Sequence, residues 1–91
     1  MKHAGRDALD KLEPLLAGLR RRPALKEKAR GTFYRGGRAF LHFHEQDAEL
    51  HADLRTSGDF ERFAATTARE RKALLARIDA LLCDGIGAKP R

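Results

Sequence analysis

Two stretches of the chain carry leucines at the spacing of an amphipathic helix. In the first, from Asp7 to Leu19, the leucines form one stripe: Leu9, Leu12, Leu16 and Leu19. Pro14 lies inside this pattern, so we expect the helix to kink there or to restart with the proline in its first turn. Pro23 follows an arginine run and ends the helix.

The second helix is predicted close to the C-terminus. Thr67 and Glu70 have the spacing of a capping box, in which each side chain bonds the backbone of the other residue. The positions behind it form one apolar stripe: Leu74, Leu75, Ile78, Leu81 and Leu82. Gly85 ends the helix, so we expect a single domain over residues 1–84 and a flexible tail over residues 85–91.

Between the helices, the pattern of apolar positions becomes that of strands. Gly36 and Gly37 separate two β-prone runs, residues 32–35 and 38–44, and this predicts a hairpin because both turn positions need positive φ. An unbroken ladder from that turn gives four pairs: Arg35 with Arg38, Tyr34 with Ala39, Phe33 with Phe40, and Thr32 with Leu41.

A third strand is predicted at residues 49–55, where polar and apolar side chains alternate after a turn at residues 45–48. Matching its apolar positions to those of the preceding strand gives four pairs: Phe43 with Leu50, Leu41 with Ala52, His42 with His51, and His44 with Glu49. Residues 60–63 are a candidate fourth strand, whereas residues 24–30 read as a linker with one partial helical turn.

The order of these elements predicts an α+β fold. A small antiparallel sheet of three to four strands, joined as a hairpin meander, would carry the N-terminal and C-terminal helices on one face. The helices would cover the more apolar face: Tyr34, Ala39, Leu41, Phe43, Leu50, Ala52 and Leu54. The other face would stay open, and beside Asp53 it would show the predicted binding face: Phe33, Arg35, Arg38, Phe40, His42, His44 and His51.

Composition narrows the class of protein. A chain of 91 residues with 42% hydrophobic and 35% charged residues suits one small domain and excludes a large enzyme with separate lobes. No apolar run approaches the roughly 20 residues of a membrane-spanning helix, and the first residues lack a signal-peptide pattern. The single cysteine, Cys83, excludes an internal disulfide and is expected to be a buried structural thiol. We therefore expect a basic, soluble, cytoplasmic protein with no membrane partner.

The net charge of +6 is unevenly distributed. Residues 20–38 contain eight basic side chains and one acidic one, whereas residues 45–61 contain six acidic side chains and one basic one. The basic segment, together with Phe33 and Phe40 as stacking rings, would suit single-stranded nucleic acid. The acidic third strand opposes that hypothesis, and the two segments of opposite sign equally suit a homo-oligomer with a two-fold axis.

The strand histidines raise the hypothesis of a metal site. His42 and His44 project to the same side of a strand, and the predicted register puts His51 across from His42. Glu49 or Asp53 would add an oxygen ligand, giving a partly open site suited to a divalent metal such as zinc, iron or nickel. The alternative is a set of half-exposed histidines that pack beside the sheet aromatics.

No catalytic constellation stands out in the sequence. It has no Ser/His/Asp order, no phosphate-cradling glycine loop and no carboxylate pair in a pocket, although a histidine side chain is able to act as a general acid or base. We therefore favour a non-catalytic binding or self-associating module that uses the open face and needs no cofactor. Nucleic-acid binding and metal binding remain the two alternatives.

Five short runs of the chain carry a resemblance to other proteins: residues 31–34, 39–45 (AFLHFHE), 52–55 (ADLR), 60–63 (FERF) and 66–68. These runs resemble a group of short uncharacterised bacterial proteins over about residues 31–82. The order of the elements is also distantly similar to that of the YdhG-like and YjbR-like small α+β domains. The resemblance implies a compact α+β domain in a bacterial cytoplasm, and it brings no catalytic residues to transfer.

Overall fold

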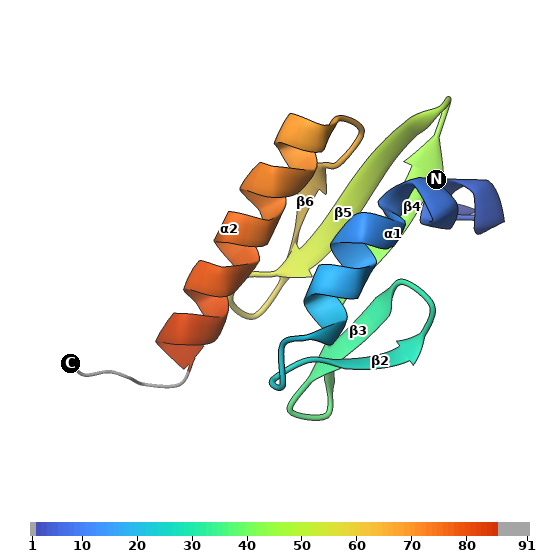
Figure 1. Cartoon of the computed structure of the whole chain (residues 1–91). Coiled ribbons are helices and arrows are strands. Elements are labelled where there is room, and N and C mark those ends of the chain that lie inside the picture. The colour runs from blue at the N-terminus through green and yellow to red at the C-terminus, as the bar shows by residue number, and fades with distance from the viewer. Residues whose placement is uncertain (1, 86–91) are drawn as a thin grey trace.

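Five antiparallel strands form a meander that carries both helices. The computed structural model describes residues 2–85, and its elements are β1 (Lys2–His3), α1 (Arg6–Arg20), β2 (Lys26–Ala29), β3 (Thr32–Arg35), β4 (Arg38–Gln46), β5 (Glu49–Arg55), β6 (Phe60–Ala64) and α2 (Ala68–Gly85). The strand order is β2-β3-β4-β5-β6, and the short β1 pairs with the end of β4. Figure 1 shows α1 and α2 on the same face of the sheet. The predicted α+β class with two flanking helices is confirmed, while three to four strands are too few.

Strand β2 occupies the segment that the sequence predicts to be a linker, so that prediction is wrong. The strand pairs with β3 after a turn at Gly31, which places Glu27 opposite Phe33. The segment is rich in charged residues, which is typical of an edge strand such as β2. At an edge, charged side chains face solvent and discourage pairing with other chains. Gly31 has a φ of +83°, and an added Cβ would lie 2.6 Å from Leu9 Cδ2, so the turn requires glycine.

The hairpin between β3 and β4 contains an irregularity that the sequence does not signal. Gly36 and Gly37 both have positive φ, and the first two predicted pairs form next to this turn. A β-bulge then makes Phe33 pair with Leu41 instead of Phe40, so that Phe40 becomes the extra residue on β4. The predicted ladder is therefore correct only next to the turn.

The bulge brings two aromatic rings into the core. Phe33 is fully buried and Phe40 is 3% exposed, and both belong to the cluster that includes the leucines of the two helices. Their predicted place on the open face is therefore wrong. Tyr34 takes the helix-free face instead, where the Lys28 ammonium lies 5.5 Å from the centre of its ring.

The register between β4 and β5 differs by two residues from the predicted one. Asp47 and Ala48 have φ values of 51° and 68°, and they form a two-residue turn where the sequence predicts four residues. The observed pairs are Leu41–Leu54, His42–Asp53, Phe43–Ala52, His44–His51, Glu45–Leu50 and Gln46–Glu49. A shift of two keeps these side chains on their predicted faces but changes the neighbour of each across the ladder.

Both helices bury their leucine stripes against the sheet. Helix α1 runs unbroken through Pro14, with Ala8, Leu12, Leu15, Leu16 and Leu19 buried. Helix α2 buries Leu74, Ile78 and Leu82, while Leu75 and Leu81 are partly buried. No helix within residues 2–85 has both the length and the apolar character needed to cross a membrane.

The structure confirms the predicted start of α2 but differs from the prediction near its C-terminal end. The capping box is confirmed, because the Glu70 amide donates to Thr67 Oγ1 at 3.1 Å and the Thr67 amide donates to Glu70 Oε1 at 3.0 Å. Cys83 is exposed, so the prediction of a buried thiol is wrong. The helix extends through Gly85, and the rest of the predicted tail, residues 86–91, lies outside the described residues.

Ion pairs neutralise part of the basic segment without using the acidic segment 45–61. The pairs join Arg20 with Glu13 and Glu27, Arg30 with Asp10 and Glu13, and Arg22 with Asp79. The Arg22–Asp79 pair is bidentate, with N–O distances of 2.6 and 2.8 Å, and ties the end of α1 to α2. The Arg22 guanidinium thereby holds the pKa of the Asp79 carboxyl below its ordinary value.

Replacing Phe33 by alanine should destabilise the fold strongly, because the substitution removes a fully buried ring. We expect the free energy of unfolding in urea to fall by about 3–5 kcal/mol. The matched control is Phe60→Ala, whose 38% exposed ring should cost only about 1 kcal/mol. Equal losses in the two variants would show that the Phe33 ring is not part of the core.

Asp79→Asn should remove part of the acid sensitivity of folding. A carboxyl whose pKa is lower in the folded state adds stability above its unfolded pKa, and that stability is lost as the pH falls through the folded value. Because the Asp79 side chain is 48% exposed, we expect a loss below about 1 kcal/mol at pH 7 and none at strongly acidic pH. Urea unfolding at both pH values measures this, with Asp59→Asn, an exposed acid, as the control. An equal loss at both pH values would contradict a role for the Asp79 charge.

Candidate functional site

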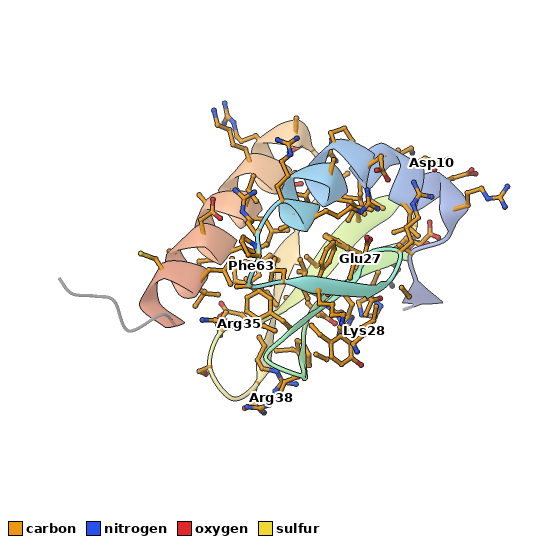
Figure 2. All side chains as sticks on the ribbon, turned by 60° about the horizontal axis from the view of Figure 1, so that its bottom comes forward. Asp10, Glu27, Lys28, Arg35, Arg38 and Phe63 are labelled. Carbon is orange, nitrogen blue, oxygen red and sulfur yellow. The ribbon has the colours of Figure 1, made fainter. Side chains whose placement is uncertain are left out.

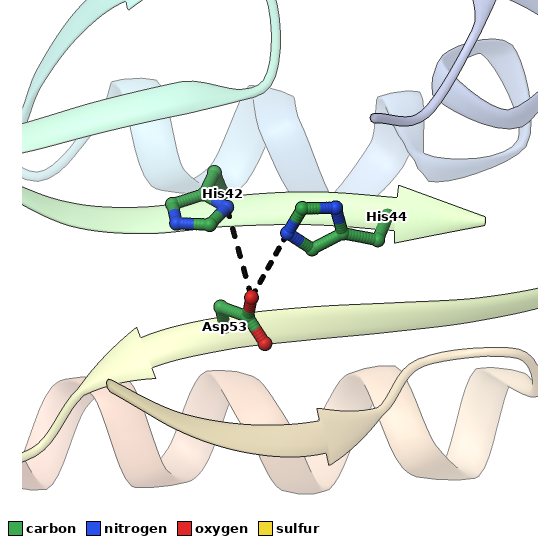
Figure 3. Close-up of side chains that lie close together, drawn as sticks. All are labelled: His42, His44 and Asp53. Carbon is green, nitrogen blue, oxygen red and sulfur yellow. Dashed lines mark ion pairs between the residues drawn. The ribbon is translucent and has the colours of Figure 1, made fainter. Parts of the chain in front are cut away.

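A cluster of polar side chains lies on the sheet face that carries no helix. Two of its members, His42 and His44, come from β4, where their i, i+2 spacing points both to one side of the strand. Asp53 lies opposite His42 on β5, and Arg62 lies opposite Asp53 on β6. Figure 3 shows the imidazoles and the carboxylate gathered on this face, with both helices behind the sheet.

The Asp53 carboxylate is the centre of this cluster. Its Oδ2 lies 2.9 Å from His44 Nε2 and 4.0 Å from His42 Nδ1, as the dashed lines in Figure 3 mark. Arg62 donates from Nε to Oδ1 at 2.9 Å and from Nη2 to Oδ2 at 3.2 Å. One carboxylate is therefore shared by a guanidinium and two imidazoles.

The carboxylate is both secluded and ionised. Asp53 is the only charged residue of the described chain that is buried, with 8% of its surface exposed. Burial alone would raise the pKa of its carboxyl, but the hydrogen bonds and positive charge of Arg62, together with the nearby imidazoles, outweigh this effect. The net result is a pKa below the ordinary value, so the cluster presents a negative oxygen at neutral pH.

Aromatic packing shelters one side of the cluster. The Phe60 ring lies edge-on to His42, with 4.9 Å between the ring centres, and the Arg55 guanidinium lies 4.4 Å from the centre of the Phe60 ring. The His42 and His44 rings are themselves nearly perpendicular, at 81°, with centres 4.8 Å apart. These contacts leave the imidazole side chains only 20% and 12% exposed, respectively.

The residues of the predicted binding face do not form one surface. His42 and His44 join Asp53, whereas His51 lies across from His44 and directs its Nε2 to Glu49 Oε1 at 3.8 Å. The predicted pairing of His51 with His42 is therefore wrong. The remaining members lie elsewhere, with Phe33 and Phe40 in the core and Arg35 and Arg38 at the turn of the β3–β4 hairpin.

Two residues of the cluster were not singled out by the sequence. Arg62 and Phe60 belong to the candidate fourth strand, which the structure confirms as β6 and pairs with β5. The alternation of residues 60–63 indicates a strand, but it does not show which residues of the neighbouring strand lie opposite them. The observed register places Asp53 opposite Arg62, and this position allows the two side chains to form their ion pair.

The observed burial also removes one part of the nucleic-acid hypothesis. Stacking of bases on sheet aromatics needs exposed rings, and neither Phe33 nor Phe40 offers one. Phosphate contacts from residues 20–38 stay a prediction, although Arg20, Arg22 and Arg30 already pair with acids of the chain.

The comparisons with known proteins assign no family to the chain. No protein-family model matches the chain, and no curated protein or solved structure matches it significantly. The resemblance to short bacterial proteins and to YdhG-like or YjbR-like domains therefore stays a prediction, and the site rests on its own chemistry.

Proposed function

We propose that the chain is a small, non-catalytic binding protein whose helix-free face holds a divalent transition-metal ion. The ligands in this proposal are His42, His44 and Asp53. The observation that carries it is the closeness of their ligand atoms, which all lie within 4.8 Å of one another. Asp53 takes the place that the sequence hypothesis gave to His51.

The spacing of these atoms is close to that of a coordination shell. Zinc binds histidine nitrogen and carboxylate oxygen at about 2.0–2.2 Å, so two ligands of a tetrahedral ion lie roughly 3.4 Å apart. The Asp53 Oδ2 distances of 2.9 Å to His44 and 4.0 Å to His42 bracket that value. Because the three ligand atoms lie within 4.8 Å of one another, side-chain movements of roughly 1 Å would admit an ion between them.

The donor set favours a borderline transition metal. Two imidazole nitrogens and one carboxylate oxygen suit zinc, iron(II) or nickel better than the all-oxygen preference of calcium or magnesium. Three protein ligands also leave at least one coordination position for water or a partner group. The metal would replace the direct contact between His44 Nε2 and Asp53 Oδ2.

Arg62 supports the site and limits its strength. Its Nε donates to Asp53 Oδ1 and its Nη2 to Oδ2, and this pair of bonds orients the carboxylate in the manner of an outer-shell partner. Its positive charge also repels a dication, so we expect moderate affinity and metal exchange instead of permanent retention. This balance fits a binding module better than a structural metal that the fold requires.

Zinc added to the tag-free protein should raise the melting temperature. At a free concentration near 100 times Kd, binding adds about 2.7 kcal/mol of stability. For a domain of this size, that corresponds to a shift of roughly 10–20 °C. Equilibrium dialysis should find one zinc ion per chain.

Two histidine variants on the same face separate the proposed site from general histidine binding. His44→Gln should abolish the thermal shift and the bound zinc, because it removes one of three ligands. His51→Gln should keep both, because His51 is directed to Glu49 and is not one of these ligands. The proposal is wrong if the wild-type protein binds no zinc, or if His51→Gln loses zinc as completely as His44→Gln.

A further inference from the structure

A cavity lies at the end of the sheet, away from the histidine cluster. It encloses about 280 Å³ between the β3–β4 turn, the loop after β5 and the last turns of α2. Three arginines and two hydroxyl side chains line it: Arg35, Arg38, Arg55, Thr56 and Ser57. We propose that this cavity binds the phosphate group of a small phosphomonoester.

The lining of the cavity carries positive charge and no carboxylate, although one lining hydroxyl, Thr56 Oγ1, donates to the Glu61 carboxylate at 3.3 Å. Within the described chain, Arg35, Arg38 and Arg55 form no ion pair, in contrast to Arg20, Arg22 and Arg62. None of the residues that line the cavity is acidic. Three uncompensated guanidinium groups around one small space attract an anion strongly and repel cations.

Two of the arginines are held in place by neutral groups. Arg55 donates from Nε to Ala39 O at 2.7 Å and from Nη1 to Gly58 O at 2.6 Å. Arg35 donates from Nη1 to Leu81 O at 3.4 Å, near the end of α2. A guanidinium has five N–H donors, so both arginines keep donors for a ligand while losing little freedom when it binds.

The third arginine is the exposed member of the set. Figure 2 shows Arg38 at the tip of the β3–β4 hairpin and Arg35 nearer to α2. Arg38 is exposed, and its side chain makes no hydrogen bond within residues 2–85. It is free to close over an anion that Arg35 and Arg55 have already oriented.

The shape and chemistry of the cavity favour a phosphomonoester over other anions. Guanidinium forks match the oxygens of phosphate in pairs, and a dianion gains more from three arginines than a carboxylate does. Its volume is at the lower end of the range of ligand cavities, so the organic part must be small. Ala39 and Leu81, both partly exposed, supply apolar lining for that part. The three full charges outweigh the partial negative charge at the end of α2.

Calorimetric titration at low salt with inorganic phosphate and with phenyl phosphate tests the proposal directly. A chelator in the buffer keeps metal out of the measurement. Both probes should bind at one site per chain, with phenyl phosphate binding more tightly because its ring meets the apolar lining at Ala39 and Leu81. Binding should persist in His44→Gln, since the histidine cluster is not part of this cavity.

Arg38→Gln should weaken binding of both probes roughly tenfold or more, the effect of losing one charge-assisted contact. Its matched control is Arg21→Gln, which removes the same charge from an exposed position outside the cavity and should leave binding unchanged. Neither side chain bonds the rest of the described chain, so both variants should fold, as circular dichroism will confirm.

Three results would overturn this proposal. The first is no heat of binding with either phosphate probe in the wild-type protein. The second is an equal loss in Arg38→Gln and Arg21→Gln, which would reveal only diffuse attraction. The third is tighter binding of an oligodeoxythymidine that lacks terminal phosphates, which would assign the cavity to a nucleic-acid backbone instead.

Discussion

The β-bulge at Phe40 is the constraint on which both faces of the sheet depend. An unbroken ladder would leave Phe33 and Phe40 on the face without helices, whereas the bulge pairs Phe33 with Leu41 and buries both rings. Removing one residue from the ladder costs about 1 kcal/mol in hydrogen bonding. Burying each ring contributes about 1.5–3 kcal/mol, so the bulged arrangement is favoured. Because β4 resumes its alternation after the bulge, His42 and His44 stay on the opposite face.

The polar cluster on that face is not explained by the needs of folding. The Asp53–Arg62 ion pair contributes little net stability, because burial of Asp53 costs desolvation and the Arg62 side chain is 47% exposed to solvent. The cluster and the arginine cavity at the end of the sheet also have opposite preferences, one for a cation and the other for an anion. The same hairpin builds both, since β4 supplies the histidines and its turn supplies Arg35 and Arg38.

Features set by local chemistry could be predicted from the sequence, and features set by distant packing could not. Two adjacent glycines mark the β3–β4 turn, and Thr67 with Glu70 marks the start of α2, because each signal lies within a few residues. The β-bulge depends on which aromatic rings the helices cover, and the residues next to Phe40 carry no sequence signal for it. The two-residue turn at Asp47 and Ala48 could not be predicted either, because alanine rarely adopts positive φ. Two of the three proposed ligands, His42 and His44, could therefore be predicted from their i, i+2 spacing. The sequence indicated Asp53 only as one of two alternative oxygen ligands.

Nuclear Overhauser spectroscopy on the isotope-labelled protein tests the β-bulge most directly, because it reports which backbone protons face each other across β3 and β4. We expect cross-strand contacts between Phe33 and Leu41, and protection of both phenylalanine rings from a soluble relaxation agent. Contacts between Phe33 and Phe40 as directly opposed residues, with both rings accessible to the agent, would contradict it. The helix-free face would then be aromatic, and the separation of the two proposed sites would fail with the bulge.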